Sequence, residues 1–177
     1  MNDTEAIQKV RDIFQQGDGR YENPENAVLV SQFIENKAIK IEKKILTDIE
    51  VSEKESEGVR APQQIYKVIG KRLLENLGYE SIIFEVSIPG GRVDILAESK
   101  NKETIAVECC SCRIDKAIDF LKEGFVLWIL SYGNGPIVKE LPLYIVKKGE
   151  NWDPYFREYE NKMNRILKEV KSPFDCL

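Results

Sequence analysis

The chain of 177 residues contains no histidine. Histidine is the side chain that most often serves as a general base near neutral pH, and it is the commonest metal ligand in proteins. Its absence excludes catalysis by Ser-His or Cys-His pairs and every zinc site that uses imidazole ligands.

Cysteine is scarce as well. The chain has four, and three of them crowd into residues 109–112, around one expected strand end. This clustering is not that of a disulfide framework, and the spacing lacks the two paired knuckles of a usual four-cysteine zinc site. We therefore interpret the cysteines as free thiols and expect a reducing, cytoplasmic setting.

Long apolar runs are missing. The longest purely apolar run covers residues 125–130, far fewer than the ~20 residues that a membrane-spanning helix needs. The first ten residues are polar and mildly acidic, so no signal peptide is expected. We expect no membrane association.

An excess of positive charge is also absent. The chain has 26 Lys and Arg against 30 Asp and Glu, a net charge of -4. A strongly basic balance would indicate nucleic-acid binding. Any nucleic-acid site in this protein must therefore be a local basic patch.

What the sequence does contain is the alternation of helical and strand patterns that is typical of an α/β fold. Residues 58–177 are expected to form one domain. From Pro62 onward the pattern predicts a helix, three strands, a helix and a strand, followed by a further strand and a final helix. This αβββαβ order predicts a mixed central sheet flanked by helices.

Residues 1–57 are expected to form an N-terminal helical arm. Asn23 is placed as an N-cap before Pro24, and apolar residues then recur at near-helical spacing to about Glu55. Such a helix would either pack on its own domain or join two copies as a homodimer. The sequence leaves both interpretations open.

The most informative stretch is the expected hairpin "GGRVDILAESKNKETIAVECCSC", in which each apolar strand carries one acidic residue, Asp94 or Glu108. With a connecting loop at residues 100–102, Asp94 falls directly opposite Glu108, with the Cβ atoms ~4.5–5.5 Å apart. Two facing carboxylates repel one another unless a cation lies between them. A divalent cation is favoured, because hard cations prefer carboxylate oxygen.

Other interpretations of these acids exist. Each could be an exposed strand residue or could pair with Arg92 or Lys116, and a slip of one residue would send the two acids to opposite faces. Glu85, on the preceding strand, is a candidate third carboxylate if it shares the face of Asp94. Otherwise Glu85 is an ordinary exposed glutamate.

The pattern of helix, strand, "GGRVD", hairpin, "IAVEC", helix and strand resembles the PD-(D/E)XK nuclease superfamily, the restriction-endonuclease-like fold, over about residues 62–147. The resemblance implies that Asp94, Glu108 and the backbone carbonyl of Cys109 bind Mg²⁺ or Mn²⁺. It further implies hydrolysis of DNA phosphodiester bonds by a metal-activated water.

The sequence departs from the family pattern at two important positions. Cys110 stands where the motif has lysine, and some similar families carry that lysine on the following helix, which makes Lys116 the candidate. A helical wheel places Arg113 closer to the apolar stripe, so Arg113 is the geometric rival. The first helix often carries an acid near the position of Gln63 or Gln64, which leaves this site with one ligand fewer.

Arg92 and Arg113 are candidates for a local basic rim that contacts DNA phosphates. The facing acids and the family resemblance together predict a magnesium-dependent endonuclease acting on DNA. The alternative is a catalytically degenerate relative that binds DNA or a protein partner without cleaving. A third hypothesis is an interaction protein whose N-terminal arm forms a dimer.

Overall fold

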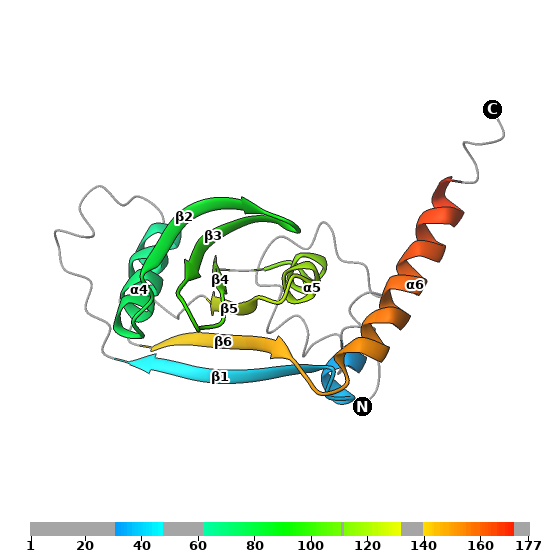
Figure 1. The fold of residues 1–177 in the computed structure, drawn as a ribbon, viewed down its shortest axis with the longest axis horizontal. Coiled ribbons are helices and arrows are strands. Elements are labelled where there is room, and N and C mark those ends of the chain that lie inside the picture. Colours follow the sequence, from blue (N-terminus) through cyan, green and yellow to red (C-terminus); the bar gives the residue numbers. More distant parts are fainter. Residues whose placement is uncertain (1–30, 48–61, 111, 132–139, 172–177) are drawn as a thin grey trace.

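The computed structural model describes residues 31–47, 62–110, 112–131 and 140–171 (Figure 1). In these residues, helices flank a six-stranded mixed sheet, so the protein has an α/β fold. After a helical segment at residues 31–35, the elements are β1 (Ile39–Thr47), α4 (Pro62–Asn76), β2 (Ser81–Ile88), β3 (Gly91–Glu98), β4 (Ile105–Cys110), α5 (Ile114–Lys122), β5 (Val126–Ser131), β6 (Glu140–Lys148) and α6 (Trp152–Lys171).

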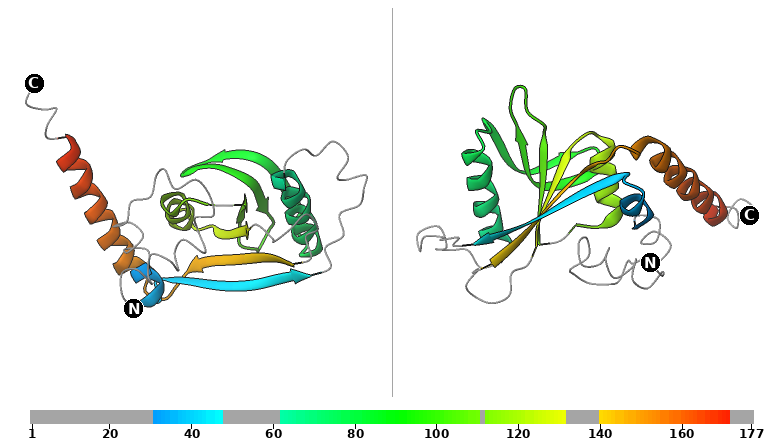
Figure 2. Two further views of the ribbon diagram at one scale, coloured as in Figure 1. Left: turned by 180° about the vertical axis from the view of Figure 1, so that it is seen from behind. Right: turned by 90° about the horizontal axis from the view of Figure 1, so that it is seen from below.

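The strands lie in the order β1-β6-β5-β4-β3-β2. β4 and β5 run parallel and are connected through α5, whereas the other neighbouring strands are antiparallel. α4 and α5 lie against opposite faces of the sheet, and α6 extends away from it (Figures 1 and 2). The order of elements predicted from residue 62 onward is confirmed.

Two apolar cores form because strand side chains alternate between the faces of the sheet. The core on the α4 side contains Tyr66, Ile69, Leu74, Ile95, Val107 and Trp128. The core on the α5 side contains Leu96, Ala106, Ala117, Ile118, Leu121 and Ile129. A polar residue on a strand can therefore be assigned to the α4 or the α5 side from the apolar residues next to it.

The helix expected over residues 23–55 is wrong for residues 39–47, which form strand β1. The helical segment ends at residue 35, and Lys37 then adopts a left-handed φ of 60°. From Ile39 onward every residue of β1 pairs with β6. The isoleucines of this stretch fit helical spacing, but they also suit a strand, and the partner strand decides the outcome.

The segment before β1 packs against the start of α6. Phe33 is 2% exposed, and its ring centroid lies 5.8 Å from those of Trp152 and Tyr159. For residues 31–47 the arm therefore packs on its own chain, in the same sheet as the later strands. The expected domain boundary at residue 57 and the rest of the arm lie outside the described residues, and the homodimer stays a prediction.

No helix in the described parts of the chain is long and apolar enough to cross a membrane.

Candidate functional site

The candidate site begins with the register of β3 and β4. Ile95 pairs with Val107, Leu96 with Ala106 and Ala97 with Ile105, which confirms the predicted register. Continued by one residue, this register places Asp94 opposite Glu108. Ala106 belongs to the core on the α5 side, so Glu108, two residues further along β4, also faces α5. Val93 and Leu96, on either side of Asp94 and Ile95, both belong to that same core, so the alternation between faces is interrupted around Asp94.

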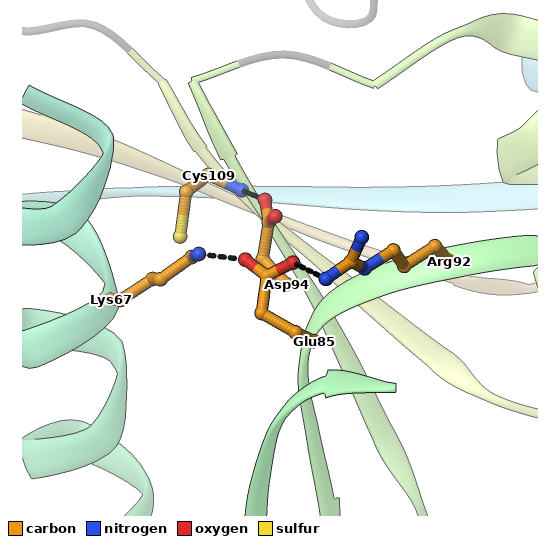
Figure 3. A network of polar contacts seen from close by, with 5 residues as sticks. All are labelled: Lys67, Glu85, Arg92, Asp94 and Cys109. Carbon is orange, nitrogen blue, oxygen red and sulfur yellow. Dashed lines mark hydrogen bonds and ion pairs between the residues drawn. The ribbon is translucent and has the colours of Figure 1, made fainter. Parts of the chain in front are cut away.

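Asp94 is held by the backbone of the neighbouring strand. The ladder between β3 and β4 ends at Ile95 and Val107, and beyond it the Cys109 amide donates a hydrogen bond of 2.7 Å to Oδ2 of Asp94 (Figure 3). A hydrogen bond to an ionised acceptor is stronger than a neutral one. This hydrogen bond holds the half-buried carboxylate of Asp94 next to β4.

Glu108 is the buried member of the pair, with 5% of its surface exposed. Nζ of Lys116 lies 2.8 Å from Oε1 in an ion pair, yet Oε1 has no aligned hydrogen-bond partner in the described part of the chain. Burial raises the pKa of Glu108 to about 7, against the opposing effect of Lys116. The charges of Asp94 and Glu85 raise this pKa further.

Lys116 reaches Glu108 because α5 packs closely on the turn between β2 and β3. A Cβ atom on Gly90 would lie 2.8 Å from Cβ of Asp119, and one on Gly91 would lie 3.5 Å from Cε of Lys116. The two glycines thus leave room for the helix and for the lysine side chain. Lys116 contacts the carboxylate of Glu108, and its rival Arg113 is exposed at the N-cap of α5.

Glu85 supplies a third carboxylate next to the pair. It lies between Phe84 and Val86, which pair with Ile95 and Val93, so Glu85 stands opposite Asp94. The three acids therefore form a row across β2, β3 and β4. The hydrogen bond from Lys67 is the main reason why the pKa of Glu85 is lowered, and the charges of Lys67, Arg92 and Lys116 add to the effect.

Lys67 is the site residue that sequence reasoning missed. It is 6% exposed on α4, and its ammonium group donates to Glu85 (Figure 3). The available signal was its helical spacing, three residues before Gly70 and seven before Leu74, which are both buried. Gln64, proposed in place of the missing helix acid, has an exposed side chain.

The remaining candidate residues differ in their surroundings. Cys109 is buried, and its backbone amide donates to Asp94. Cys110 pairs with Ser131 in the sheet, but its side chain lies outside the described residues, as does that of Gln63. Arg92 is exposed and pairs with Glu85 at 2.6 Å.

The carboxylates of this site are also potential ligands of a metal ion. Within the described ranges no three His, Cys, Asp or Glu side chains converge on a metal position. Oε1 of Glu108 is nevertheless a buried carboxylate oxygen, whose partner is the Lys116 ammonium group 2.8 Å away, next to a second carboxylate. This donor set fits a hard divalent cation. No family model, curated protein or solved structure matches this chain.

Proposed function

We propose that the protein is a Mg²⁺- or Mn²⁺-dependent endonuclease that hydrolyses DNA phosphodiester bonds on a restriction-endonuclease-like fold. The observation that carries the proposal is the arrangement of Asp94, Glu108 and Lys116. Lys116 on α5 pairs with Glu108 on β4, and Asp94 on the neighbouring strand β3 accepts a hydrogen bond from the amide of Cys109, the residue after Glu108. Two carboxylates and one lysine are the set that the PD-(D/E)XK resemblance implies.

The residues that would hold the ion are Asp94, Glu108 and the backbone carbonyl of Cys109. When bound, such an ion lowers the pKa of a water molecule and neutralises charge on the phosphate. Asp94 is positioned for this role by the Cys109 amide, and Glu108 by the walls of the α5-side core.

Lys116 takes the role of the lysine that Cys110 replaces in the motif. Its side chain is 19% exposed, so the ammonium group lies at the boundary between the core and solvent. From there it can orient an attacking water or stabilise the negative charge that develops on the phosphate. Arg92 and Arg113 are both exposed and would contact the DNA backbone nearby.

Cleavage of supercoiled, single-stranded and branched DNA, with Mg²⁺ or Mn²⁺, tests the proposal. Wild-type protein should cleave at least one of these substrates, and Asp94→Asn should abolish the activity. Glu98→Gln is the matched control, because Glu98 is an exposed acid on the same strand. Absence of cleavage on all substrates, or full activity in Asp94→Asn, contradicts the proposal.

A second candidate function is a nuclease-like protein that binds DNA or a protein without cutting. The ion pair between Lys116 and Glu108 favours it, because a lysine already compensates the buried carboxylate. This candidate predicts no uptake of Mg²⁺ or Mn²⁺ at the acid pair. Calorimetric titration separates the two functions, since stoichiometric metal binding that Asp94→Asn removes is incompatible with the second.

A further inference from the structure

The carboxylate of Glu85 lies between two cations from two different elements. Lys67 on α4 donates to Oε1, and Nη2 of Arg92 on β3 lies 2.6 Å from Oε2 (Figure 3). Each oxygen therefore has its own positive partner. A phosphate group likewise has oxygens on one central atom, and two of them can each be bound by a cation.

The two cations differ in exposure. The side chain of Lys67 is 8% exposed, whereas those of Arg92 and Glu85 are 65% and 37% exposed. A buried ammonium group is costly without an anion beside it. Lys67 thus forms the buried side of an anion-binding position, and Arg92 forms the side that is open to solvent.

The backbone of Glu85 is distorted to place its carboxylate there. Its φ is 56°, in the left-handed region that only a few per cent of non-glycine residues adopt. Such a conformation is strained for a residue with a side chain. The pairs on either side of Glu85 and Asp94 belong to the β2–β3 ladder, while this pair does not. A change at Glu85 would therefore leave the neighbouring pairs in place.

We propose that Lys67 and Arg92 form a phosphate-binding site that Glu85 occupies from within, and that the phosphate group of a ligand replaces its carboxylate. A phosphodiester carries the same single negative charge as the carboxylate that it replaces between Lys67 and Arg92. Because Glu85 stands opposite Asp94, the bound phosphate lies next to the row of acids. The choice of DNA as its source rests on the proposed function, whereas the anion site itself does not.

Anion binding without metal tests the proposal. A short labelled single-stranded oligonucleotide is titrated by fluorescence anisotropy in EDTA, and inorganic pyrophosphate is titrated by calorimetry. Glu85→Gln removes the internal competitor and should tighten binding about tenfold, the size of one charge-assisted hydrogen bond. Glu75→Gln is the matched control, because Glu75 pairs with Lys71 on the exposed face of α4 and does not pair with Lys67 or Arg92.

The gain should disappear when Lys67→Gln, or Arg92→Gln where the first does not fold, is added to Glu85→Gln. A gain with both ligands identifies a general phosphate site, and a gain with the oligonucleotide alone identifies a phosphodiester site. Unchanged or weaker binding of both ligands by Glu85→Gln overturns the proposal. Because no metal is present, this result is independent of whether the wild-type protein cleaves DNA.

Discussion

Replacing Glu108 by glutamine should change how stability depends on pH. Folding raises the pKa of this carboxyl from 4.5 to about 7. Between these values the folded protein binds the proton more tightly than the unfolded chain does. The contribution of Glu108 to the free energy of unfolding is therefore fully present below pH 4.5, falls as pH rises, and stays low above about pH 7.

The size of this fall follows from the pKa change. At about 1.4 kcal/mol for each pH unit, a rise from 4.5 to about 7 corresponds to about 3 kcal/mol. Glu108→Gln keeps the shape of the side chain but does not titrate. Relative to wild type, the variant should therefore gain about 3 kcal/mol of unfolding free energy between pH 4.5 and about pH 8.

Urea denaturation in EDTA at several pH values measures this difference. Subtracting wild type from variant removes the titration that the two proteins have in common. Glu98→Gln, the exposed acid on β3, should give a flat difference. A flat or falling difference for Glu108→Gln would refute the argument that burial dominates this site.

Three further outcomes are expected. Lys116→Met should lower the cleavage rate about a hundredfold or more, with oligonucleotide binding in EDTA nearly unchanged; equal losses in both assays would assign the lysine to binding instead. Magnesium at about pH 8 should raise the melting temperature of wild type but not of Asp94→Asn, and equal shifts would place the ion elsewhere. Gly149→Ala should cost about 1–3 kcal/mol or more by overpacking, since its Cβ would lie 1.9 Å from the Lys37 carbonyl oxygen. Gly124→Ala, with no atom within 4 Å, should cost less in the same urea titration.

Local information was sufficient for the hairpin that carries the two acids. A short loop and strict alternation specify which residues of β3 and β4 face one another, so Asp94 and Glu108 were predicted on one face in the observed register. The helix from Pro62 was predicted for the same reason, because a proline start and a glycine after the end are local signals.

Contacts between residues distant in the sequence determined the conformation of β1 and the positions of Lys116 and Lys67. The isoleucines of β1 fit either a helix or a strand, and pairing with β6, about a hundred residues later, selects the strand. The contact between Lys116 and Glu108 depends on how closely α5 packs on Gly90 and Gly91. Lys67 joins the site only because α4 lies beside Glu85 at the edge strand β2. The sequence by itself determined the carboxylate pair through alternation and loop length, while tertiary packing alone determined which cations surround it.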